Sequence, residues 1–264
     1  MRGMRWKAKF ILFSILCGVL YFVEQRYDFF RLREIDVVPV GILPDSIVWG
    51  AIPVSCEHFW LSLFLGGREF AGNIENFYPV ELSVKISGWG RYRVHIKPLE
   101  PILYVSWRSN MWLLSKNGRM WLASHPSNLA VKGMVFPKKP ILAWDSGLAL
   151  PIDPESRKGD IFPSSLPMAK IKKWYDEIER IGWEEDIYCV LAKKLDGRPV
   201  VQLLLGSGEK ISSEIVVKDD TADWASLAAA LAEVFPGAGN RIPGGLVVNA
   251  TFTDKFTVTS KDNR

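Results

Sequence analysis

The chain has 264 residues, of which 48% are hydrophobic and 12% aromatic, so its composition supports real folded cores. Its 33 basic and 29 acidic residues give a formal net charge of +4, and the first nine residues carry all of it through Arg2, Arg5, Lys7 and Lys9. The rest of the chain is neutral, which argues against a nucleic-acid partner, and three cysteines are too few for a disulfide scaffold.

The N-terminal segment joins this basic leader to an apolar run at residues 10–23. Fourteen residues of helix rise about 21 Å, which is shorter than the roughly 30 Å hydrocarbon core of a bilayer. Tryptophan and lysine side chains suit the headgroup level, so the membrane helix can start at Trp6. That start lengthens the helix to about 27 Å. A cleavable signal peptide is the alternative, but residues 20–27 are bulky or charged and offer no small-residue cleavage site. We therefore expect a cytoplasmic tail at 1–9 and one transmembrane helix at 10–26.

The charges that flank this segment predict its orientation. The leader contains four basic residues and no acidic one, whereas the far flank mixes both signs. The positive-inside rule then places the N-terminus in the cytoplasm and the bulk of the chain in the periplasm or outside the cell. In such a compartment Cys56 and Cys189 could pair, although two buried free thiols are the simpler interpretation.

The next seventy residues predict a small unit of mixed structure. Alternating residues at 33–40 predict a strand, and helices are expected at 45–52 and 67–77. Residues 80–87 and 92–97 alternate apolar with polar side chains on either side of Gly88-Trp89-Gly90, which predicts an antiparallel hairpin. The expected order is β-α-α-β-β, with a domain junction near the prolines at 98 and 101.

Residues 101–259 predict a mostly antiparallel β domain with two helices. The first helix, 166–182, carries an apolar stripe and ends at Gly182, and the second covers about 221–235. Strands at 246–252 and 255–259 complete the domain, and residues 260–264 form a tail.

Several short phrases give the chain a resemblance to the bacterial cell-division protein family FtsQ, called DivIB in some lineages. They are 33–41, which resembles the family's first strand, and Tyr78-Pro-Val80, Trp89-Gly90, 97–101, Trp107 and the turn 115–118. The chain departs from the family at 97–101, which lacks an arginine, and in its unusually aromatic loop 53–67. The resemblance implies an α+β chain with one transmembrane helix, a POTRA-like domain at 31–100 and a β domain at 101–259.

The same resemblance implies a non-enzymatic scaffold of the division septum in the cytoplasmic (inner) membrane. Its partners would be the membrane and small bitopic division proteins of the FtsB (DivIC) and FtsL types, with no cofactor, metal, small-molecule substrate or nucleic acid. The alternatives are another anchored POTRA-type protein of envelope assembly or secretion and, further off, an envelope enzyme.

The resemblance further implies that a partner strand pairs with an open edge formed by the last strands of the β domain. The residues expected to bind the partner are Asn249, Ala250, Thr251, Phe252, Thr253, Phe256 and Val258. Strand alternation would place Asn249, Thr251 and Thr253 on one face and Ala250 and Phe252 on the other. The alternative is that Phe252 and Phe256 are core residues and the edge is covered.

Two further features leave alternatives open. The aromatic loop with His58, Phe59, Trp60, Leu63 and Phe64 is either an exposed docking or membrane-surface patch or packing between the two helices. The three histidines lie far apart in the sequence, Cys189 has no histidine nearby, and the glycines of 206–210 lack phosphate-loop spacing. We therefore predict no catalytic residues.

Overall fold

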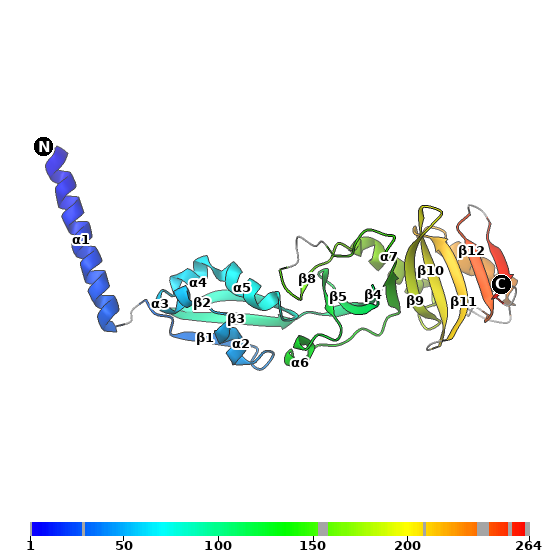
Figure 1. Ribbon diagram of the computed structural model, residues 1–264, viewed down its shortest axis with the longest axis horizontal. Coiled ribbons are helices and arrows are strands. Elements are labelled where there is room, and N and C mark those ends of the chain that lie inside the picture. Colours follow the sequence, from blue (N-terminus) through cyan, green and yellow to red (C-terminus); the bar gives the residue numbers. More distant parts are fainter. Residues whose placement is uncertain are drawn as a thin grey trace. The chain divides into compact units, whose positions relative to one another are not determined.

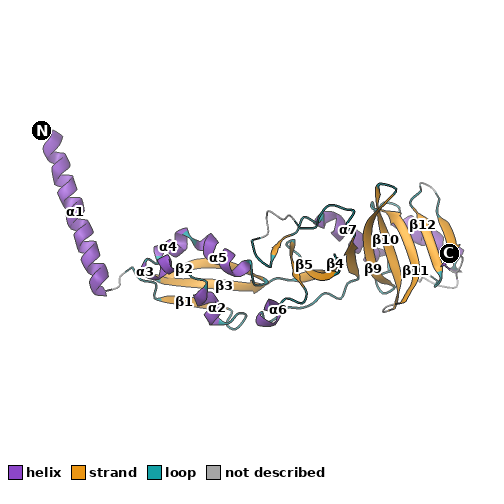
Figure 2. Ribbon diagram, viewed as in Figure 1, coloured by secondary structure: helices purple, strands orange, loops and turns teal. Residues whose placement is uncertain are grey.

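The computed structural model describes residues 2–27, 30–152, 158–207, 210–236, 243–252 and 255–261. The chain divides into two compact units, coloured by sequence in Figure 1 and by secondary structure in Figure 2. Unit 1 consists of Met1–Pro98 with Ala130–Lys132, and unit 2 of Leu99–Leu129 with Gly133–Arg264.

The N-terminal helix α1, Arg2–Tyr27, does not meet the expectation of a transmembrane helix at 10–26. None of the helices formed by the described residues is long and apolar enough to cross a membrane. Lys9 bounds the apolar run of α1 at one end, and Glu24 and Arg26 bound it at the other. The fourteen apolar residues between them are the whole of the run.

Unit 1 contains a three-stranded sheet in the order β1-β3-β2. β1 (Glu34–Val38) lies parallel to β3 (Arg91–Pro98), and β2 (Val80–Gly88) is antiparallel to β3, as the sequence predicted for the hairpin. Between β1 and β2 the chain forms four short helices: α2 (Asp45–Gly50), α3 (Val54–His58), α4 (Leu61–Leu65) and α5 (Gly67–Glu75). The predicted β-α-α-β-β order is therefore wrong, because the aromatic loop expected at 53–67 is itself helical.

The core of unit 1 lies between α5 and the sheet. Phe70 and Ile74, one turn apart on α5, are fully buried, and α5 packs on β2. Val94 of β3 and Val48 of α2 are also 0% exposed. Cys56 lies in the same interior as a buried free thiol, as the simpler interpretation expected.

Unit 2 contains a sheet of ten strands, which is larger than predicted and mixed rather than mostly antiparallel. Its order is β13-β12-β11-β10-β9-β7-β4-β5-β6-β8. The pairs β4–β7, β7–β9 and β11–β12 are parallel. The strands, in chain order, are β4 (Pro101–Trp107), β5 (Asn110–Ser115), β6 (Arg119–Leu122), β7 (Ile141–Trp144), β8 (Phe162–Pro163), β9 (Ile187–Leu195), β10 (Arg198–Ser207), β11 (Lys210–Lys218), β12 (Leu246–Ala250) and β13 (Thr257–Ser260).

In the described part of this unit three helices accompany these strands, where two were predicted: α6 (Ser127–Ala130), α7 (Met168–Ile181) and α8 (Trp224–Val234). The expected fold of a transmembrane helix, a small POTRA-like domain and a two-helix β domain is therefore wrong, and the chain is α+β with two mixed sheets. Crossovers between distant segments produce the parallel pairs, and a strand pattern does not reveal such crossovers.

The core of unit 2 collects side chains from the sheet and from α7 and α8. Val105, Leu142, Val201 and Val248 are 0% exposed, and they come from four different strands. The apolar stripe of α7 is buried, and Gly182 ends this helix in the left-handed conformation at φ 76°, as the sequence predicted. Helices and strands that are distant in the sequence thus share one core.

Candidate partner-binding edge

β13 is the terminal strand of the ten-stranded sheet. It pairs antiparallel with β12, in the register that sets Val248 opposite Val258 and Asn249 opposite Thr257. No other strand among the described residues pairs with its outer side. Figure 1 shows this strand in red beside β12 at one end of the sheet. A strand with one unpaired side can pair with another chain.

The register shows which backbone groups face outward. Lys261 donates its backbone N–H to the Gly245 carbonyl at 2.7 Å, just beyond the strand. In an antiparallel pair every second residue directs its backbone N–H and C=O toward the neighbouring strand. Thr259 and Thr257 therefore also direct theirs toward β12. The N–H and C=O of Val258 therefore point away from β12, toward the open side.

The side chains of this hairpin separate into a core face and a solvent face. Val248 is 0% exposed, and Val258, Ala250 and Phe256 are partly buried against the same core. Thr257 and Thr259 are exposed. Because the core face fixes the register of β13, its outer edge presents a defined row of backbone groups.

The predicted binding residues do not all lie in strands. β12 ends at Ala250, and the Asn249 Oδ1 atom accepts hydrogen bonds from the Thr251 N–H at 3.1 Å and the Thr251 hydroxyl at 2.8 Å. This turn stops the strand, so the expected alternation does not continue through Thr251 and Phe252. Thr253 lies outside the described residues.

A groove of about 360 Å³ lies beside the end of β12 and the residues that precede β13. Ala250, Phe252 and Phe256, all expected at the site, line it together with Lys255. Phe252 is 49% exposed, and the Lys255 ammonium lies 5.4 Å from the centre of its ring. The other wall consists of residues that the sequence prediction missed. They come from the end of β11, from α8 and from the segment between them: Val217, Lys218, Asp220, Asp223, Trp224, Ser226, Leu227 and Ala230.

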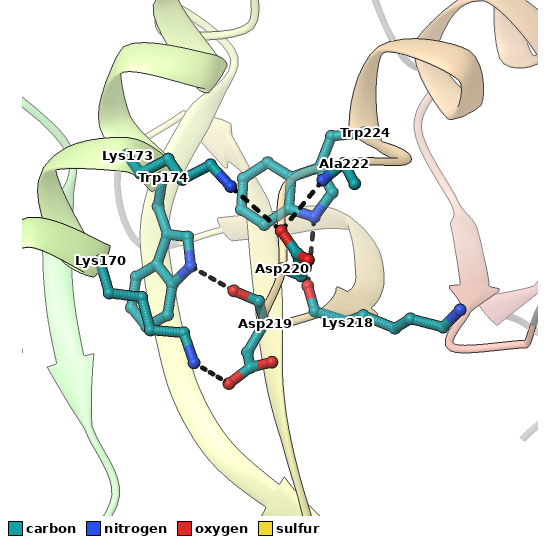
Figure 3. Close-up of polar contacts among 8 residues, drawn as sticks. All are labelled: Lys170, Lys173, Trp174, Lys218, Asp219, Asp220, Ala222 and Trp224. Carbon is teal, nitrogen blue, oxygen red and sulfur yellow. Dashed lines mark hydrogen bonds and ion pairs between the residues drawn. The ribbon is translucent and has the colours of Figure 1, made fainter.

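Hydrogen bonds hold the α8 wall of the groove in place, as Figure 3 shows. The indole N–H of Trp224 donates to the Lys218 carbonyl at 3.1 Å, and that of Trp174 on α7 donates to the Asp219 carbonyl at 2.7 Å. Both indoles are buried, so these bonds satisfy donors that would otherwise be costly to bury. The segment between β11 and α8 is thereby fixed to α7.

Two ion pairs strengthen the same segment. Lys170 pairs with Asp219, and Lys173 pairs with Asp220 at 3.1 Å. The hydrogen bond from Lys173 lowers the pKa of Asp220, helped by the positive charge of Lys173 and by the backbone N–H of Ala222. Asp220 therefore stays ionised at neutral pH and holds the start of α8.

A larger cavity of about 730 Å³ lies elsewhere in unit 2, between α7 and the starts of β7 and β9. Its rim carries both Lys138 and Lys139 and the carboxylates of Glu179, Glu184 and Glu185. Lys139 already faces Glu179 at 3.8 Å. Charges of both signs line both sites, but the smaller groove lies next to the residues that lead into β13, whose outer side is unpaired among the described residues.

One cluster has the residue types of a hydrolytic triad. The Nδ1 atom of His125 lies 2.6 Å from the Ser127 hydroxyl, and its Nε2 atom lies 3.3 Å from an Asp160 carboxylate oxygen. Ser127 is 5% exposed, however, and its backbone N–H also donates to His125 Nδ1. A nucleophile must reach its substrate, so we interpret this cluster as the cap of α6.

Cys189 offers no better nucleophile, because burial raises the pKa of its thiol. No group of three His, Cys, Asp or Glu side chains in the described ranges could hold a metal ion.

No protein-family model matches this sequence, and the search of curated proteins gives no match.

Proposed function

We propose that this protein is a non-enzymatic scaffold of the bacterial division machinery that recruits small bitopic division proteins of the FtsB (DivIC) and FtsL types. It would act at the septum, on the outer face of the cytoplasmic membrane. The observation that carries the proposal is the unpaired outer side of β13, whose register is fixed by core packing.

Strand pairing supplies the mechanism. An extended segment of the partner would form backbone hydrogen bonds with the outward N–H and C=O of Val258. Such bonds contribute affinity that depends little on sequence, so side chains must supply the choice of partner. The groove beside Phe252 and Phe256 would take an apolar side chain of the partner.

A substitution of Val258 tests this mechanism. In Val258→Pro the ring replaces the outward N–H and blocks an approaching strand, while the bonds between β13 and β12 remain. Val258→Ala is the matched control, because it removes most of the same side chain and keeps the N–H. Each variant is expressed as the tagged full chain in the native bacterium, and the proteins captured from its membranes are identified by mass spectrometry.

We expect the wild type and Val258→Ala to capture a single-span coiled-coil protein, and Val258→Pro to capture at least about tenfold less of it, which corresponds to about 1.4 kcal/mol. Equal capture by both variants would reject strand pairing on β13. A fluorescent fusion should also gather at the division site, and an even distribution in dividing cells would reject the division role.

A further inference from the structure

Three aromatic side chains of unit 1 lie together, and we call them the aromatic patch: Phe30, Phe59 and Trp89. Phe59 is 40% exposed and Trp89 is 46% exposed. The Phe30 ring lies between them, with its centroid 5.7 Å from that of Phe59 and 6.1 Å from that of Trp89. Three aromatic rings from separate parts of the chain thus form one surface, which is uncommon on a protein that meets only water.

Buried neighbours hold the patch in place. Trp60, 5% exposed, lies under it with its ring centroid 5.2 Å from that of Trp89. The Trp60 backbone N–H donates to the Phe30 carbonyl at 2.8 Å, and the Tyr92 hydroxyl donates to the Trp60 carbonyl at 2.8 Å. The exposed rings therefore need little reordering to bind, which favours contact with another surface.

The patch lies where the chain leaves α1. Phe30 follows Tyr27, the last residue of α1, by three residues, so the two are at most about 11 Å apart along the chain. The backbone N–H of Arg33 donates to the Gly90 carbonyl at 2.8 Å, which places the Trp89 turn beside the same entry point. Apolar side chains of α1 are themselves largely exposed, among them Leu12 at 71% and Phe22 at 67%. The patch therefore lies only a few residues along the chain from a helix that exposes apolar side chains.

Arginines outnumber carboxylates nearby, although the Glu24 carboxylate accepts a hydrogen bond from the Phe30 N–H at 2.7 Å. Arg31 and Arg33 are exposed at the entry point. Glu34 pairs with Arg91 at 3.2 Å, so these two charges compensate each other. A surface that meets the patch would gain from carrying negative charge.

We propose that the aromatic patch rests in the headgroup region of a phospholipid bilayer and that Arg33 contacts anionic headgroups. Tryptophan and other amphipathic rings favour this region, and anionic lipids attract nearby arginines. The proposal does not require α1 to cross the bilayer. It is also independent of β13 and of any division partner, so it can fail while the proposed function holds.

The test compares two tryptophans of unit 1 with equal exposure. Trp49 on α2 is 46% exposed, as is Trp89, but it is not one of the residues that form the patch. A fluorophore is attached to Trp89→Cys or to Trp49→Cys in the full chain carrying Cys17→Ser, because Cys17 is exposed whereas Cys56 and Cys189 are buried. The protein is bound to vesicles of phosphatidylcholine and phosphatidylglycerol that contain a headgroup-level nitroxide lipid.

We expect the nitroxide lipid to quench the label at position 89 at least about threefold more than the label at position 49, because the patch lies at headgroup depth. Replacing phosphatidylglycerol by phosphatidylcholine should weaken this difference. Phe59→Cys gives a second labelling position if Trp89→Cys does not fold. Quenching at 59 or 89 no greater than at 49 would overturn the proposal and leave a protein as the occupant of the patch.

Discussion

The two terminal strands of the ten-stranded sheet, β8 and β13, differ in whether their outer edges can pair with another strand. At the β8 end, Ser164 donates its N–H to the Gly118 carbonyl at 2.7 Å, so Pro163 occupies a position whose N–H would point outward. Proline has no such group, and Ile152 bridges to Ser164 on the outer side. At the β13 end, Val258 occupies the equivalent position and keeps its N–H.

This difference shows which end can bind a partner. Proline, a two-residue strand and a covering segment are devices that prevent strand pairing. The β8 end has all three, whereas β13 has four residues and no proline. An exposed edge without these devices suits binding.

The largest expected effect is on the free energy of unfolding, compared between a substitution at the β8 end of the sheet and one at the β13 end. Phe162 is 1% exposed in the core beside β8, whereas Val258 is only partly buried. Phe162→Ala should lower the free energy of unfolding by about 3–5 kcal/mol, and Val258→Ala by no more than about 1.5 kcal/mol. Denaturant unfolding of both variants measures this, and equal losses would contradict the distinction between a closed end and an open end.

The second effect concerns binding. Phe252→Lys places a second positive charge beside Lys255 in the groove and should weaken capture of the proposed partner about tenfold. Phe136→Lys is the matched control, because Phe136 is similarly exposed at 44% but does not line the groove. Similar capture by the two variants would show that the groove does not take part.

A smaller effect concerns the segment that walls the groove. The lowered pKa of Asp220 contributes stability that is present above the unfolded value near 3.8 and is lost as the pH falls through the folded value. Asp220→Asn should therefore lower Tm slightly at pH 7, by no more than about 2 °C for so exposed a pair, and the difference should shrink below about pH 4. Glu184→Gln, at an exposed carboxylate outside this network, serves as the control. A difference that persists at low pH would exclude the ion pair as its cause.

The smallest expected effect is at the closed end. Pro163→Thr restores the outward N–H, but the strand remains two residues long and covered by Ile152. We expect neither new self-association nor new partner binding. Sedimentation should show the same molecular mass as the wild type, and a dimer would mean that proline alone keeps this edge closed.

The sequence alone predicted those elements whose pattern lies within a short stretch of the chain. The periodicity of α7 and its Gly182 stop predicted that helix, and the alternation on either side of Gly88-Trp89-Gly90 predicted the β2–β3 hairpin. The turn after β12 also had a local signal, since Asn249 followed two residues later by Thr251 favours a side-chain hydrogen bond that stops a strand.

The rest depended on contacts between distant segments. The parallel pairing of β11 with β12 joins residues about thirty positions apart, and nothing in either strand specifies that partner. Trp224 and Leu227 of α8 line the groove only because α8 packs on the sheet near Phe252, so the sequence pattern predicted Phe252 but not the opposite wall. The apolar run at 10–23 is a local signal, but on its own it falls short of a bilayer's thickness.

The four-residue strand β7 has a consequence for how unit 2 folds. It pairs in parallel with β4 on one side and with β9 on the other, so it joins two antiparallel groups, β4–β5–β6 and β9–β10–β11. Each group is made of hairpins that can form early, because their loops are short, whereas joining them requires closure of much longer loops. Folding of unit 2 should therefore be limited by the docking of two preformed halves on β7. The amides of β7 should report this late step in pulsed hydrogen exchange.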